Sequence, residues 1–405
     1  MPTQQTSPPT SPPTSPQTSP RTAPRISPRM SGQGASRIDS AALVVAAADV
    51  AKIAAEHAQA AERDRRLAPE VVRFMLDAGF ARHFVPRRHG GDAGTFEEIV
   101  RAVSVVGEGC TSAAWAASLT ASLGRMAAYL PEAGQRRIWA GGPDALIVGA
   151  LMPFGRARRE EGGWRINGTW PYVSVVDHAD WALVCAMTTE ERPVARFFAV
   201  PRGSWRTEDT WSSVGMRGTG SNTLHVEDVF VADELTFTRD AIATGVADNA
   251  EAPCHRVPLK AVNGLCFAAP VLGAARAALA AWREGTAPRH TSASGGLESA
   301  AAVVLGRAAG EADTAALLLE SAARTADTGR VTDLEVARNS RDCALAAELA
   351  TAAVDRLFAS AGTRAHQETA PLQRHWRDAH SAAGHVVLGF AGAAEAYARE
   401  LQREK

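Results

Sequence analysis

Several features are absent from the 405-residue sequence. No uninterrupted apolar stretch reaches 18 residues, so we expect no membrane span. The five cysteines form no CxxC pair, which argues against a zinc site or a disulfide framework, and we expect no other metal site. The 43 Lys and Arg residues balance the 44 Asp and Glu residues, which argues against a nucleic-acid-binding coat. These absences predict a soluble, cytoplasmic protein.

Generic catalytic motifs are missing as well. The sequence has no Walker loop, no GxGxxG string ahead of a helix, no HExxH and no GxSxG. No generic motif therefore indicates a cofactor, a catalytic metal or a serine nucleophile.

Residues 1–38 differ in composition from the rest. They repeat Ser/Thr-Pro units and carry four arginines and no acidic residue. Proline removes backbone donors and the segment has little apolar surface to bury, so it predicts a disordered tail. Its composition is also typical of transit peptides, but it lacks their amphipathic stripe. We interpret it as an inert solvated extension.

Three blocks of different periodicity follow the tail. Residues 39–145 have the apolar spacing of helices. Residues 146–240 contain short β-branched or aromatic runs separated by turn signals such as Asn167-Gly168, which predicts an antiparallel sheet or small barrel. Residues 241–405 return to the helical period and predict a four-helix bundle. Its expected helices are Leu259–Arg283, Glu298–Thr325, Thr332–Ala361 and Pro371–Glu400.

This order of blocks resembles the α+β fold of the acyl-CoA dehydrogenase superfamily: an N-terminal helical domain, a central antiparallel β-domain and a C-terminal four-helix bundle. Short strings, in family order between about Ala41 and Gln402, resemble its flavin-dependent monooxygenase branch (class D, two-component). The strings include Ser112–Trp115, Trp170–Ser174, Gly215–Asn222 and Pro371–Asp378.

The resemblance implies a hydroxylase that uses O2 and reduced flavin, either FMNH2 or FADH2. A separate NAD(P)H:flavin reductase would supply the flavin, and a C4a-hydroperoxide would deliver one oxygen atom to an aromatic, polycyclic or amine small molecule. Homotetramers are common in the superfamily. The Ala- and Arg-rich composition resembles actinobacterial proteins of secondary metabolism, such as antibiotic biosynthesis.

A test for a carboxylate base separates this branch from the dehydrogenases. Proton abstraction next to a thioester needs a positioned Glu, and the family's position, eight residues after Asp378, holds Val386. The superfamily's alternative location for this Glu, early in the first helix of the bundle, holds no carboxylate either, because residues 252–283 contain no Asp or Glu. The preceding residue, His385, matches the flavin-facing histidine of the monooxygenase branch. An imidazole that titrates near neutrality could give and accept the protons of oxygen transfer.

The resemblance places the remaining site residues. Ser174 would act catalytically beside flavin N5, although Val175 replaces the usual glycine and predicts a different loop path. Arg289 would reach the flavin phosphates of a neighbouring subunit. The expected cofactor contacts are Trp115, Tyr172, Ser174, Arg217, Thr219 and Arg289.

The substrate pocket is expected at Ser122, Leu123 and His380. Phenol hydroxylases of the branch tend to carry a second histidine eight residues after the Trp115 position, and Leu123 stands there. A leucine cannot deprotonate a phenol, so the substrate is expected to be bulkier, more apolar, or oxidised at nitrogen or at an unactivated carbon.

Two alternatives stay open. The first is a flavin oxidase or dehydrogenase on a non-standard substrate, with His385 as the base. The second is a non-catalytic relative without flavin, which the departures at Leu123 and Val175 favour. The colour and flavin binding of the purified protein distinguish the three classes. A monooxygenase is colourless and protects added reduced flavin from oxidation, and an oxidase keeps yellow oxidised flavin. A non-catalytic relative binds no flavin.

Overall fold

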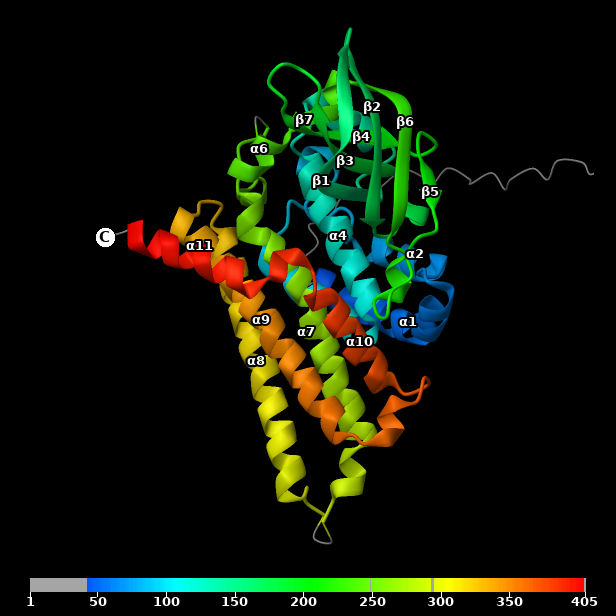
Figure 1. Ribbon diagram of the computed structural model, residues 1–405, viewed down its shortest axis with the longest axis vertical. Coiled ribbons are helices and arrows are strands. Elements are labelled where there is room, and N and C mark those ends of the chain that lie inside the picture. Colours follow the sequence, from blue (N-terminus) through cyan, green and yellow to red (C-terminus); the bar gives the residue numbers. More distant parts are fainter. Residues whose placement is uncertain (1–41, 248, 293–294, 404–405) are drawn as a thin grey trace, which may run out of the picture. The chain divides into compact units, whose positions relative to one another are not determined.

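The computed structural model describes residues 42–247, 249–292 and 295–403, so the predicted tail lies outside the described residues. Helices, strands and again helices follow one another along the chain, which confirms the expected fold class (Figure 1). The N-terminal helices are α1 (Ala42–Asp64), α2 (Pro69–Ala78), α3 (Phe96–Gly109), α4 (Thr111–Ala127) and α5 (Glu132–Ile138).

Local chemistry explains where these helices begin. Pro69 occupies the first turn of α2, where its missing N–H costs nothing. Thr95 caps α3 by accepting a hydrogen bond from the backbone N–H of Glu98. Helix α4 is almost entirely buried and is rich in small residues, so it can lie between the sheet and the other helices.

The sheet has seven strands in the order β5-β6-β2-β1-β3-β4-β7. All neighbouring strands run antiparallel except β1 and β3, which are parallel. Trp170 is buried against Gly155 and Gly168, where any Cβ would overlap its indole ring. The strands are β1 (Ile147–Glu160), β2 (Gly163–Val173), β3 (Trp181–Thr188), β4 (Ala195–Pro201), β5 (Arg206–Glu208), β6 (Asn222–Ala232) and β7 (Thr236–Thr238).

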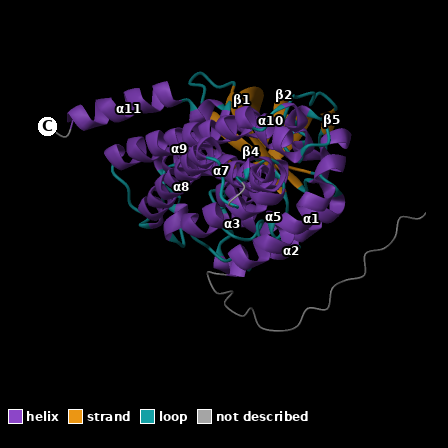
Figure 2. Ribbon diagram, turned by 90° about the horizontal axis from the view of Figure 1, so that it is seen from below, coloured by secondary structure: helices purple, strands orange, loops and turns teal. Residues whose placement is uncertain are grey.

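The C-terminal helices surround α7 (Leu259–Gly285), which packs against α3, α4, α9 and α10. Helix α7 is long and apolar enough to cross a membrane, yet 78% of its most apolar window is buried inside the protein, as in a core helix. Figure 2 shows α3 and α7 between α1 on one side and α8 and α9 on the other. The other helices are α6 (Arg239–Thr244), α8 (Ser299–Asp327), α9 (Asp333–Ser360), α10 (Pro371–Ala383) and α11 (Phe390–Arg403).

The single helix expected over Pro371–Glu400 is wrong. Helix α10 ends at Ala383, a short 3-10 turn spans Val386–Leu388, and α11 begins at Phe390. Glycines at 384 and 389 flank the break, and both lower helix propensity. Between them His385 adopts an extended backbone with φ −67° and ψ 133°. The break therefore lifts His385 off the helix and gives its side chain a direction that helical periodicity could not predict.

Candidate active site

Five segments of the chain bring aromatic rings and hydroxyl groups together. Trp115 comes from α4, Phe267 from α7 and His385 from the α10–α11 connection. The ring centroids of Phe267 and His385 lie 3.8 Å apart in a stacked arrangement, and that of Trp115 lies 5.0 Å from Phe267 and 5.8 Å from His385. Trp115 Nε1 donates to Ser174 Oγ over 3.2 Å. We call Trp115, Ser174, Ser221, Phe267 and His385 the aromatic–hydroxyl cluster.

A chain of hydroxyl groups continues from Ser174 into the protein. Ser174 Oγ lies 2.8 Å from Ser221 Oγ, which lies 2.7 Å from Thr219 Oγ1. Thr219 Oγ1 donates to the carbonyl of Met216 over 2.9 Å. When Thr219 donates there, Ser221 donates to Thr219 and Ser174 donates to Ser221, since each hydroxyl has one proton. The same carbonyl also accepts from Trp211 Nε1 and the Thr219 N–H, so it stays paired if the direction reverses.

The loop after β2 keeps an unusual backbone at Val175. We expected this β-branched residue to move the loop, but Val175 adopts the left-handed region at φ 61° and ψ 16°. Such a conformation costs a non-glycine residue about 1–3 kcal/mol. The Val175 side chain is buried and its N–H donates to the Thr219 carbonyl over 2.9 Å. Burial and this hydrogen bond offset the strain and fix Ser174 beside Trp115.

His385 is uncharged in this environment. Burial lowers the pKa of His385 to about 4, with no other cause acting on it. The expectation of titration near neutrality therefore does not fit the structure. The Val387 backbone N–H donates to His385 Nδ1 over 3.3 Å, so Nδ1 carries the lone pair and Nε2 carries the proton. A neutral imidazole in this tautomer is a hydrogen-bond donor at Nε2.

Other predicted cofactor residues lie close in sequence to the cluster. Tyr172, on β2, has a left-handed φ of 63° and a side chain that is 74% exposed. Thr219 is buried within the hydroxyl chain. Arg217 donates from Nε to the Glu62 carbonyl and from Nη1 to the Ser213 carbonyl, each over 3.0 Å. The first bond ties the turn of Arg217 to α1, and the second closes the loop that leads into this turn. Contact of Tyr172, Thr219 and Arg217 with flavin stays a prediction.

Three predicted residues do not join the cluster within this chain. Leu123 points at β1, because a Cβ on Gly149 would lie 2.7 Å from its Cδ2. His380 is exposed on α10 and pairs through Nε2 with Asp355 Oδ1 over 2.8 Å. Arg289 bonds the Ala361 carbonyl beyond the C-terminal end of α7, about 27 Å of helix from Phe267. Its predicted role requires a second subunit.

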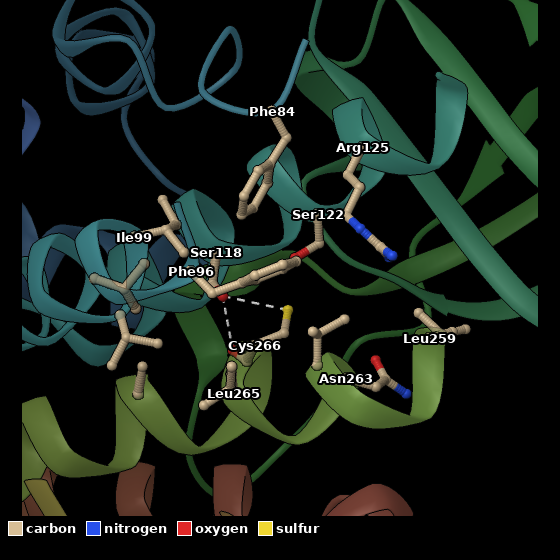
Figure 3. A pocket seen from close by; sticks show the side chains of 14 residues that line it. Phe84, Phe96, Ile99, Ser118, Ser122, Arg125, Leu259, Asn263, Leu265 and Cys266 are labelled. Atoms are coloured by element: carbon tan, nitrogen blue, oxygen red, sulfur yellow. Dashed lines mark hydrogen bonds between the residues drawn. The ribbon is translucent and has the colours of Figure 1, made fainter. Parts of the chain in front are cut away.

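A cavity that the sequence did not indicate lies between α3, α4 and α7. Its volume is about 30 Å³, which suits about two waters. Ser122, one of the predicted pocket residues, lines it (Figure 3). The polar groups missed by sequence reasoning are Ser118, Arg125, Asn263 and Cys266. Helical periodicity did not indicate that Arg125 is buried, since an arginine on a helix is usually solvated.

The cluster fits an uncharged planar ring with polar edges, such as isoalloxazine. Trp115 and Phe267 offer aromatic faces, and Ser174 and His385 offer one hydroxyl and one neutral imidazole. Within the described residues no carboxylate contributes to the environment of His385. These groups suit reactions of oxygen beside an isoalloxazine ring, and they lack the carboxylate that proton abstraction from an acyl thioester needs.

Comparisons with known proteins agree with the fold and the resemblance. Residues 265–405 match the family model for the acyl-CoA dehydrogenase C-terminal domain. The flavin-dependent monooxygenase oxygenase subunit HsaA of Mycobacterium tuberculosis is 33% identical over 82% of this chain and 88% of its own length. The oxygenase component of FADH(2)-dependent resorcinol hydroxylase from Rhizobium sp. is 30% identical over 86% and 91%.

A solved structure agrees with these relatives. XiaF from Streptomyces sp., in complex with FADH2 and glycerol, superposes with a TM-score of 0.82 and 29% sequence identity, covering 89% of this chain and 94% of XiaF. The chain belongs to the two-component flavin-dependent monooxygenases of the acyl-CoA dehydrogenase superfamily.

Proposed function

We propose that the protein is the oxygenase component that takes FMNH2 or FADH2 from a separate NAD(P)H:flavin reductase and hydroxylates a small aromatic or polycyclic molecule with O2. The observation that carries the proposal is that Trp115 contacts both Ser174 and a neutral His385, which stacks on Phe267. Among the described residues no carboxylate acts on this imidazole. Relatives named as oxygenase subunits and hydroxylases support it.

The residues of the cluster have distinct tasks in this proposal. Bound reduced flavin supplies the electrons with which O2 is activated. Trp115 and Phe267 exclude water from the reacting atoms, which protects a reactive oxygen species from wasteful loss. Ser174 Oγ offers a lone pair while its proton goes to Ser221, or a proton when the hydroxyl chain reverses. His385 Nε2–H donates a hydrogen bond without changing the charge of the site.

Assembly and location belong to the same proposal. A homotetramer would bring Arg289 of one subunit toward the flavin phosphates of another subunit. Within one chain, Arg289 lies beyond the C-terminal end of α7 and away from the aromatic–hydroxyl cluster. Cytoplasmic location supplies the reductase and its NAD(P)H. A role in secondary metabolism, such as antibiotic biosynthesis, is inferred from composition alone.

An oxygen-incorporation assay tests the function. Purified protein is mixed with an NAD(P)H:flavin reductase, FMN or FAD, isotopically labelled O2 and a panel of aromatic compounds. One labelled oxygen atom in the product, dependent on both proteins, is expected. Tightly bound oxidised flavin with substrate oxidation but no labelled product would identify an oxidase instead. Failure to bind or protect reduced flavin would identify a non-catalytic relative.

A further inference from the structure

Arg125 is a buried cation without an acidic partner in the described part of the chain. Its side chain lies near the end of α4 and is 2% exposed, and no carboxylate forms an ion pair with it there. Burial lowers the pKa of Arg125, with Tyr129 and Cys254 as the other groups that act on it. Several kcal/mol is the typical cost of burying an ion, so an unpaired guanidinium needs an explanation.

The protein stabilises Arg125 only in part. Nε donates to the Cys254 carbonyl over 2.6 Å and Nη2 donates to the Val257 carbonyl. The guanidinium carbon lies 5.6 Å from the ring centroid of Phe96 and 5.8 Å from that of Tyr129. Carbonyl dipoles and aromatic faces stabilise a cation without neutralising it. Nη1 makes no hydrogen bond to any described residue, so one edge of the fork remains available.

That guanidinium borders the cavity between α3, α4 and α7. Figure 3 shows Arg125 and Ser122 directed from α4 toward α7, which contributes Asn263 and Cys266. The Asn263 side chain has no hydrogen bond to any described residue. Apart from Ser118, the other walls are apolar, with Phe96 and Ile99 among them. An apolar pocket with a few convergent polar groups is the usual form of a small-molecule site.

The cavity and the aromatic–hydroxyl cluster lie along the same two helices, α4 and α7. On α4, Trp115, Ser118, Ser122 and Arg125 are spaced three or four residues apart and share one face, which spans about 15 Å. On α7, Phe267 stacks on His385 while its neighbour Cys266 lines the cavity. A substrate that extends from the cluster along α4 would therefore reach Arg125 over about 15 Å. The cavity volume suits a compact end group, not a second ring system.

We propose that Arg125, with Asn263 and Ser122, receives a carboxylate of the substrate, so that the enzyme selects aromatic or polycyclic acids over their neutral analogues. A carboxylate matches the planar fork of a guanidinium and would supply the missing counter-charge. This inference rests on the proposed function and deepens it by naming the substrate class. Leu123 does not enter the argument, because it faces β1.

Binding of matched acids and amides tests the proposal without requiring turnover. Aryl alkanoic acids whose carboxylate lies up to about 15 Å from the ring are each compared with their primary carboxamides, by calorimetry on the flavin-loaded protein. At least one acid is expected to bind about tenfold or more tightly than its amide. Arg125→Gln should abolish that preference, and Arg125→Lys should keep part of it. Arg196→Gln, which removes a half-buried arginine of β4, should leave it unchanged.

Each outcome has a definite meaning. Equal affinity for acid and amide, a preference that survives in Arg125→Gln, or equal binding of chloride and the aromatic acids overturns the proposal. If Arg125→Gln does not fold, Asn263→Ala replaces it and should weaken the acid alone. Hydroxylation of neutral aromatics without acid preference would refute this inference and leave the proposed function intact. Acid-selective binding without any oxygen incorporation would refute the proposed function and leave the carboxylate site at Arg125 intact.

Discussion

The backbone N–H of Met216 donates to Oδ1 of Asp378 over 2.6 Å, so α10 holds the turn on which the hydroxyl chain ends. Asp378 is buried, and burial raises its pKa to about 6. Asp378 satisfies this backbone donor, while the neighbouring Arg377 pairs with Glu62. The same contact positions the Met216 carbonyl that accepts from Thr219.

Asp378→Ala should therefore lower the free energy of unfolding by more than the loss of the charge alone would. It leaves the buried Met216 N–H without an acceptor, which typically removes about 1–3 kcal/mol from the free energy of unfolding. Asp378→Asn keeps an acceptor oxygen, so its free energy of unfolding should remain close to that of the parent protein. Urea unfolding of both variants at about pH 8 measures the difference. Equal losses in the two variants would show that the Met216 contact contributes nothing.

Ser221→Ala tests the hydroxyl chain. The substitution removes the group between Ser174 and Thr219, so the Ser174 hydroxyl loses its fixed direction. We expect a several-fold rise in H2O2 released per O2 consumed and a stability loss of about 1 kcal/mol. Thr223→Ala is the matched control, since it removes a hydroxyl of β6 that pairs with Thr210 away from the cluster. Equal uncoupling in both variants would contradict a specific role for Ser221.

The neutral state of His385 predicts the pH dependence of coupling. Its pKa of about 4 lies below the unperturbed value, so the imidazole stays uncharged as the pH changes from about 6 to 8. The ratio of product to H2O2 should show no His385-dependent inflection in that range. His385→Ala should release H2O2 in place of product, and His385→Gln, which keeps a donor, should uncouple less. An inflection near pH 6.5 that disappears in His385→Gln would contradict the assignment.

The sequence predicts the order of blocks well because each long element has a clear period. It fails at Gly384–Gly389, where the apolar pattern continues across a break that two glycines make possible. It also misses β5 and β7, whose three residues are too few to show a period. Arg125 could not be recognised, because its isolation is created by residues distant in sequence. The resemblance was needed to select His385 and Ser174, whose proximity to Trp115 depends on tertiary structure.

Acid should destabilise the protein through buried histidines, namely His83 and His375 as well as His385 of the cluster. Burial lowers the pKa of His83 to about 4 and that of His375 to about 3. Between these values and about 6.5 the unfolded chain binds more protons than the native protein, so stability falls as the pH falls. Each histidine can contribute about 1.4 kcal/mol per pH unit in this window. Asp378 opposes them, because its pKa is raised and its stabilisation is lost as the pH rises through about 6. Burial also raises the pKa of three other carboxyl groups, those of Asp92, Glu108 and Asp327.

Urea unfolding at about pH 5 and pH 7 measures this slope. His375→Gln should make the dependence of stability on pH shallower, because it removes a buried imidazole whose pKa is lowered to about 3. An unchanged slope in His375→Gln, or a protein more stable at the lower pH, would contradict the prediction.

The crossing of α3 and α7, which closes the cavity, depends on two glycines in contact. A Cβ on Gly273 would lie 2.6 Å from Gly107 Cα and 2.6 Å from the Ser104 carbonyl oxygen, both backbone atoms that cannot rotate away. Gly273→Ala should therefore separate the helices and lower stability by about 1–3 kcal/mol. Gly306→Ala, on the exposed side of α8 with no atom near its added methyl, should raise stability by about 0.5–1 kcal/mol. Thermal unfolding of the pair separates steric overlap from helix propensity, because propensity alone would make both variants more stable.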